Sequence, residues 1–71
     1  MKIKEFKKNV APYMKKGYVA MNEVGDWDFF IGKPDAWFHH WSDSFGLSSS
    51  LDMFDIEPVD NWQESLFEVG K

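Results

Sequence analysis

The chain has 71 residues, which is enough for one small domain, residues 1–71, with a thin core. It contains no cysteine, and this excludes disulfides, thiolate zinc sites and thiol nucleophiles and favours a reducing, intracellular environment. The formal charge is −4, but six of the eight lysines lie within residues 2–16, so the rest of the chain is strongly acidic. We favour a basic helix lying against an acidic body, or charge that serves solubility alone, over the alternative of one charged face offered to a partner.

Apolar runs in the sequence are only a few residues long, which predicts no membrane-spanning segment. The opening residues "MKIKEFKKNV" contain lysines but no apolar stretch behind them, so we do not expect a signal peptide.

Residues 3–11 are predicted to form a helix. Ile3, Phe6, Val10 and Met14 recur along one stripe at helical period, and most of the lysines lie off that stripe. Pro12 has no N–H to continue the helix, so a kink or a new turn is expected there. Gly17 is expected to stop this helical region.

A β-hairpin is predicted next, with strands near 18–23 and 27–31 and a turn in which Gly25 adopts a positive φ. Alternation in the second strand places Trp27, Phe29 and Ile31 on one face, with Asp28 and Phe30 on the other.

The segment 51–56 also alternates and is interpreted as a third strand, closed by Pro58. Asp60 followed by Gln63 has the spacing of a capping box, which predicts a short helix over 61–67 with Trp62 and Leu66 on one side.

These elements predict an α+β fold in which the N-terminal helix packs on a small antiparallel sheet of three to four strands, followed by a short C-terminal helix. The helical stripe is expected to face a set of strand residues, and Trp62 and Leu66 to close one edge. The strand residues expected in the core are Val19, Met21, Trp27, Phe29, Ile31, Leu51 and Met53.

The stretch "KPDAWFHHWSDSF", residues 33–45, concentrates histidine and aromatic side chains. Adjacent His39 and His40 point to opposite faces of a strand, and even with Asp35 and Asp43 nearby the chain lacks the histidine spacings of zinc sites. We therefore expect no metal and no other cofactor, and interpret the stretch as an aromatic cluster that is partly core and partly an exposed ledge.

The sequence gives little support for catalysis or for nucleic-acid binding. The chain has no nucleophile elbow and no glycine-rich phosphate loop, so it is not expected to be an enzyme. It has no arginine, and its acidic remainder would repel a polyanion, so we do not expect nucleic acid as a partner.

Two short motifs carry a resemblance. The first contains Tyr18, Ala20, Gly25 and Trp27 and ends at Lys33-Pro34, and the second is "PVDNWQESL" at 58–66. In this order the chain resembles small uncharacterised proteins encoded by tailed bacteriophages and prophages, over about residues 3–69. The resemblance implies an accessory protein in the bacterial cytoplasm and transfers no catalytic residue; "HHWSDSFG" departs from the pattern.

The sequence therefore favours a non-enzymatic protein-interaction module that binds a host or phage protein and self-associates weakly if at all. Its aromatic contact surface is expected at Trp37, Phe38, His39, His40 and Trp41, because exposed aromatic rings are effective anchors. The alternative is an acidic mimic of nucleic acid that inhibits a DNA- or RNA-binding protein, since aspartates are numerous for the length.

Overall fold

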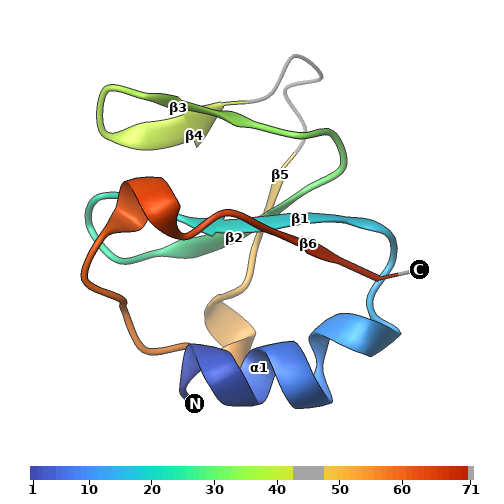
Figure 1. Ribbon diagram of the computed structural model, residues 1–71. Coiled ribbons are helices and arrows are strands. Elements are labelled where there is room, and N and C mark those ends of the chain that lie inside the picture. Colours follow the sequence, from blue (N-terminus) through green and yellow to red (C-terminus); the bar gives the residue numbers. More distant parts are fainter. Residues whose placement is uncertain (43–47, 71) are drawn as a thin grey trace.

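The computed structural model describes residues 1–42 and 48–70 and has three layers (Figure 1). The first layer holds helix α1 (Ile3–Asn9) and the 3-10 turns η1 (Ala11–Tyr13) and η2 (Asp52–Phe54). The second is a four-stranded antiparallel sheet in the order β5-β2-β1-β6. Its strands are β1 (Gly17–Met21), β2 (Trp27–Phe30), β5 (Ser48–Ser50) and β6 (Phe67–Val69). The third is the hairpin of β3 (Asp35–Trp37) and β4 (His40–Ser42). The predicted α+β class is confirmed.

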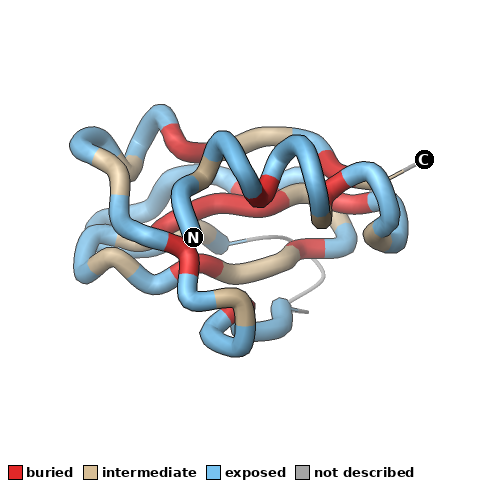
Figure 2. Tube along the Cα trace, turned by 90° about the horizontal axis from the view of Figure 1, so that it is seen from below, coloured by how far each residue is buried: buried red, intermediate tan, exposed pale blue. Residues whose placement is uncertain are grey.

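The N-terminal helix forms where the apolar stripe predicts it. Phe6 is fully buried, and Ile3, Val10 and Met14 pack half-buried against the core. The helix gives way to η1 at Pro12, as expected from the missing N–H. Figure 2 shows the outer surface of this layer exposed to solvent. Within the described part of the chain, no helix has the length and apolar character needed to cross a membrane.

Gly17 does not stop the helical region; it is the first residue of β1 (Gly17–Met21). A Cβ atom at this position would lie 2.5 Å from the Phe29 ring and 2.6 Å from the Phe30 carbonyl oxygen. A glycine is therefore required there because β1 and the ring of the neighbouring strand approach too closely for a side chain.

The predicted hairpin is confirmed as β1 and β2 (Trp27–Phe30), which pair with Val19 opposite Phe29 and Met21 opposite Trp27. Gly25 has φ 96° in the connecting turn, and the Asn22 side chain accepts hydrogen bonds from the Val24 and Asp26 N–H groups.

Both faces of this sheet are covered. The α1 face carries the main core, whose buried members are Phe6, Ala11, Val19, Met21, Trp27, Leu51, Ile56 and Val69. On the opposite face, Ala20 and Phe30 are also buried. The expectation that Ile31 and Met53 belong to the core is wrong, because they are 44% and 75% exposed.

The segment 51–56 is not a strand. It forms η2 and then turns at Asp55, whose φ of 48° breaks an extended conformation, while Leu51 and Ile56 at its two ends are buried. The third strand lies just before it, at β5 (Ser48–Ser50).

The predicted C-terminal helix over 61–67 is only the 3-10 turn η3 (Trp62–Glu64), and β6 (Phe67–Val69) follows. Asn61, not Asp60, is the N-cap: its side chain accepts a hydrogen bond of 3.1 Å from the Gln63 N–H. β6 then pairs with β1 and places Val69 in the core.

Candidate functional site: the β3–β4 hairpin

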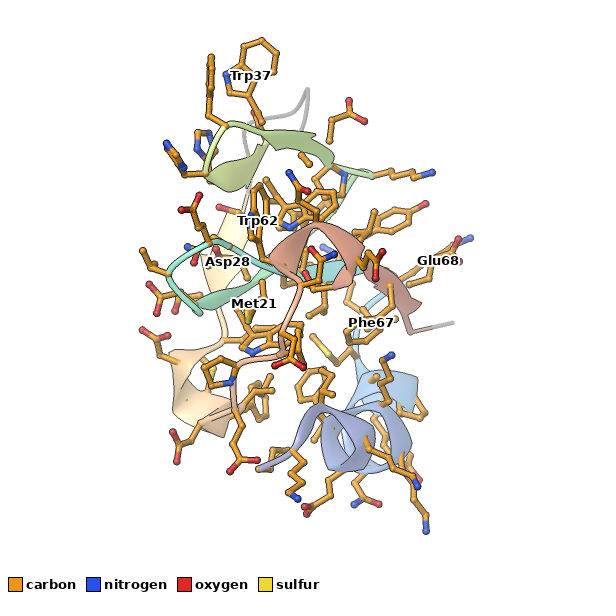
Figure 3. The ribbon with its side chains drawn as sticks, turned by 60° about the vertical axis from the view of Figure 1, so that its left-hand side comes forward. Met21, Asp28, Trp37, Trp62, Phe67 and Glu68 are labelled. Carbon is orange, nitrogen blue, oxygen red and sulfur yellow. The ribbon has the colours of Figure 1, made fainter. Side chains whose placement is uncertain are left out.

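The five predicted contact residues lie on one hairpin. β3 and β4 pair with Ala36 opposite Trp41 and Trp37 opposite His40, so Phe38 and His39 form a two-residue turn. This hairpin lies at the opposite end of the molecule from α1 (Figures 1 and 3). The structure thus brings all five residues together, but it gives them different surroundings.

Trp37 and Phe38 face solvent. Trp37 is 59% exposed and Phe38 75% exposed. Their ring centroids are 5.0 Å apart with an interplanar angle of 78°, an edge-to-face contact in which each ring limits the freedom of the other. Figure 3 shows Trp37 projecting from the end of the hairpin, away from the sheet. The two rings, called here the aromatic tip, therefore lie outside the core.

The backbone at the aromatic tip is strained. Phe38 has φ 51°, in the left-handed region that costs an L-residue with a Cβ about 1–2 kcal/mol. The first position of a two-residue hairpin turn with positive φ is normally glycine, asparagine or aspartate. A phenylalanine that is both strained and exposed adds little to folding stability, and such outliers concentrate at binding sites.

His39 ties the turn to the rest of the protein. Its Nδ1 contacts the Glu23 carboxylate, and its carbonyl oxygen accepts a hydrogen bond of 3.1 Å from the Glu23 N–H. Both side chains are largely exposed, so this ion pair adds little stability by itself. Its effect is to hold the tip against the β1–β2 turn. His40 is exposed on β4 and takes no part in this contact.

Trp41 anchors the base of the hairpin. Its Nε1–H donates a 2.9 Å hydrogen bond to the Met21 carbonyl oxygen, and its ring packs edge-to-face on Trp62 at 6.0 Å. The predicted contact residue Trp41 is therefore half-buried, and its contacts fix the hairpin to β1 and η3.

The histidines do not converge on an ion site. Among the described residues, no group of three histidine or carboxylate side chains is placed to hold a metal ion. Asp35 pairs with Ser42 at the other end of the hairpin from His39 and His40. Asp43, the second carboxylate considered from the sequence, and the aromatic Phe45 lie outside the described residues.

Acidic side chains gather near the β1–β2 turn. Burial raises the pKa of the Asp28 carboxyl above its ordinary value, and the charges of Asp26 and then Asp52 raise it further. Asp26, Asp52 and Asp55 line an open hollow of about 460 Å³. The acids therefore repel one another here.

The lysines of the N-terminal segment do not neutralise these acids through ion pairs. In the part of the chain that the structure describes, the one ion pair within 4.0 Å is His39 with Glu23. Lys7 instead lies over the Phe67 ring, 4.6 Å from its centroid. Among the described residues, no ion pair within 4.0 Å therefore joins the basic N-terminal segment to the acidic remainder.

Sequence reasoning missed Glu23 as the partner of His39 and Phe38 as a strained turn residue. No local signal identifies the first, because residues 23 and 39 meet only through the folded sheet. The turn at Phe38 lacks the glycine or asparagine that normally marks a two-residue turn, so no sequence signal identifies it.

Comparisons with protein-family models, with curated proteins and with solved structures found no match for this chain.

Proposed function

We propose that this protein is a non-enzymatic interaction module that binds a host or phage protein in the bacterial cytoplasm through the aromatic tip. The observation that carries the proposal is the position of Trp37 and Phe38: two exposed rings, packed together, on a turn whose backbone is strained at Phe38. A sequence under pressure for stability alone would place glycine at that turn and polar residues beside it.

The anchoring of the hairpin supports this function. Binding costs less when the contact residues are already ordered, because fewer side-chain and backbone freedoms are lost on association. Here the Trp41 hydrogen bond to Met21 fixes one end of the hairpin, and the Glu23 contact with His39 fixes the other. The tip is therefore presented in one orientation, as a preformed anchor.

The test is capture from a bacterial lysate on the immobilised protein, comparing wild type with Trp37→Ala and Phe38→Ala. A tryptophan anchor at the centre of an interface contributes about 2 kcal/mol or more, so we expect a loss of captured partner of about thirtyfold. Tyr13→Ala is the matched control, because Tyr13 is an aromatic residue that is 87% exposed on η1. Equal capture by wild type and both tip variants would contradict the proposal.

Salt provides a second criterion. A contact made by apolar rings should persist when salt is raised from about 0.1 M to about 1 M, which shortens the electrostatic screening length from about 10 Å to about 3 Å.

A second candidate function, mimicry of nucleic acid, is favoured by the acids around Asp28. The charges of Asp26 and Asp52 are near enough to raise the pKa of the Asp28 carboxyl, so negative charge is concentrated there. This function predicts binding to a nucleic-acid enzyme that weakens steeply with salt and is competed by DNA. It would be lost in the double variant Asp26→Asn, Asp52→Asn and retained in Trp37→Ala.

A further inference from the structure

A second surface lies at the edge of the sheet formed by β5. Among the described residues β5 pairs only with β2, with Ser49 opposite Phe29. The Leu51 N–H donates to the Trp27 carbonyl oxygen at 3.0 Å. In an antiparallel pair hydrogen-bonded residues alternate, so Ser49 also bonds to β2, while the backbone N–H and C=O groups of Ser48 and Ser50 point away from it.

Two apolar hollows run along this edge on the face that carries α1. They measure about 300 Å³ and about 310 Å³, and they share Lys15, Phe29 and Ser49 as lining residues. The first hollow extends past Leu51 to Met53, and the second extends past Ser48 to Ile31. Met53 and Ile31 are the side chains that were expected in the core and are instead exposed. The hollows are therefore two ends of one groove, called here the edge groove.

The middle of the edge groove carries a positive charge. Lys15 lines both hollows, whereas the adjacent Lys16 lines neither. The other lining side chains of the described groove are apolar or serine. A ligand that fits this chemistry has apolar side chains at both ends and a carboxylate between them.

We propose that the edge groove binds an extended acidic peptide segment of a partner protein, which adds to β5 as an antiparallel strand. Four backbone hydrogen bonds would form, two at Ser48 and two at Ser50. The ligand residue opposite Ser49 would direct its side chain toward Lys15, and the residues two positions away on either side would enter the two hollows, because side chains alternate along a strand. The recognised pattern is apolar-x-acidic-x-apolar.

A second copy of this chain fits the edge less well. Antiparallel pairing of two β5 strands would be centred on Ser49, so the Lys15 side chains that line the groove beside it would meet near the two-fold axis. Like charges placed together oppose association. The charge of the groove therefore favours an acidic partner over self-pairing. This surface is separate from the aromatic tip, so the inference does not depend on the proposed function.

The test is an amide chemical-shift titration of the ¹⁵N-labelled protein with the peptide acetyl-Leu-Thr-Glu-Thr-Leu-amide. Strand addition predicts the largest shifts at the Ser48 and Ser50 amides, which gain hydrogen bonds. A peptide with lysine in place of glutamate should bind about fivefold to tenfold more weakly, because the charged contact with Lys15 is lost. A peptide with alanine in place of both leucines should bind more weakly as well.

A charge exchange makes the test specific. Lys15→Glu should reverse the preference so that the lysine peptide binds better than the glutamate peptide, and Lys16→Glu, the matched control, should leave the original preference in place. Ser50→Pro should remove one outward donor and weaken binding without breaking the hydrogen bonds between β2 and β5. Trp37→Ala should bind the peptide as wild type does, which separates this surface from the aromatic tip.

The inference would be overturned by no shift at Ser48 and Ser50, by an unchanged preference in Lys15→Glu, or by shifts confined to the aromatic tip. Concentration-dependent shifts at β5 without peptide would overturn it in favour of a second copy as the occupant.

Discussion

At the scale of single residues, Met21 is the point where the layers are joined. Its N–H donates to the Ser65 hydroxyl oxygen at 2.8 Å, its carbonyl accepts from Trp41, and its sulfur accepts from the Val59 N–H at 3.3 Å. The Ser65 hydroxyl in turn donates to the Trp62 carbonyl oxygen at 2.6 Å. Ser65 thus provides the acceptor for the buried N–H at the end of β1 and bonds to the first residue of η3. Trp62 lies between the sheet and the hairpin (Figure 3).

Ser65→Ala is expected to lower the free energy of unfolding by about 1–3 kcal/mol, because the Met21 N–H loses its acceptor in a buried place. Urea unfolding followed by circular dichroism measures the change. Ser42→Ala is the control, since Ser42 is exposed on β4; a cost at Ser65 no larger than that at Ser42 would contradict the assignment.

Asp28 makes a second residue-scale prediction. Burial and neighbouring acids raise the pKa of its carboxyl, so the folded state favours the protonated form. The free energy of unfolding should therefore fall as pH rises and the carboxyl becomes charged. Asp28→Asn should therefore be more stable than wild type at pH 7. The difference should shrink as pH falls through the raised pKa of the folded state, and it should be absent below the ordinary carboxyl value of 3.8.

Asp26→Asn should give a smaller gain with the same pH dependence, because its charge is one of the causes of the Asp28 shift. Urea unfolding at several pH values tests both variants. An Asp28→Asn protein that is less stable than wild type at pH 7 would show that the carboxylate is favourable in the fold.

At the scale of elements, the β3–β4 hairpin depends on two contacts with the rest of the protein. Trp41→Phe removes the hydrogen bond to Met21 and keeps a smaller aromatic ring beside Trp62, and it should cost about 1 kcal/mol. Trp41→Ala also removes the packing on Trp62 and should cost more. Native-state hydrogen exchange should show faster exchange of the β3 and β4 amides in both variants, with the larger increase in Trp41→Ala. The β1 and β2 amides should change less. Uniform change across all strands would mean that the hairpin is not a separately opening unit.

Phe38→Gly separates stability from binding at the aromatic tip. Glycine adopts the observed φ of 51° without strain, and the lost ring is 75% exposed, so the variant should gain up to about 1 kcal/mol in unfolding free energy. The same variant should capture less partner than wild type. Thermal unfolding and the lysate capture assay measure the two effects on one preparation. A variant that is destabilised and captures normally would contradict the strained-anchor interpretation.

Some of the helices and strands could be predicted from local sequence patterns, and others could not. The helix at Ile3–Asn9 and the β1–β2 hairpin follow from local apolar period and from the turn at Gly25. β5 and β6 do not follow from local patterns. The three serines of β5 have no apolar alternation and form a strand only by pairing with β2. Alternation over 51–56 misleads because Leu51 and Ile56 reach the core from the two ends of a turn.

For the candidate site, the five predicted residues are consecutive in the sequence and lie on one hairpin. It could not distinguish the exposed pair Trp37 and Phe38 from the anchor Trp41, because that distinction depends on which ring meets Trp62 and Met21 after folding. The edge groove was also beyond local patterns, since its walls come from three separate parts of the chain.

At the scale of the whole molecule, the residues that flank α1 on both sides are hydrogen-bonded to later segments of the chain. The Gly70 N–H donates to the Ala11 carbonyl at 3.0 Å, and the Glu57 N–H donates to the Met1 carbonyl at 2.8 Å. Between these links, the Phe6 ring makes edge contacts with Phe54 at 5.5 Å and Phe67 at 6.3 Å. The first and last parts of the chain therefore share one core, and we expect them to unfold together.

Phe6→Ala should cost about 3–5 kcal/mol, since the ring is fully buried. A domain of this size has a total stability of only about 4–10 kcal/mol, so the variant should be partly or wholly unfolded at 37 °C. Phe6→Leu keeps most of the volume and should remain folded. Circular dichroism during heating distinguishes the two. A well-folded Phe6→Ala protein would mean that α1 is peripheral to the core.

The strained turn at Phe38 has a consequence for how this sequence should change over generations. If the aromatic tip binds a partner as proposed, loss of that partner should favour glycine or asparagine at position 38 and polar residues at position 37. Where the partner persists, both rings should be kept despite their cost. The side chain at position 38 in descendants of this chain would then record whether its interaction is still in use.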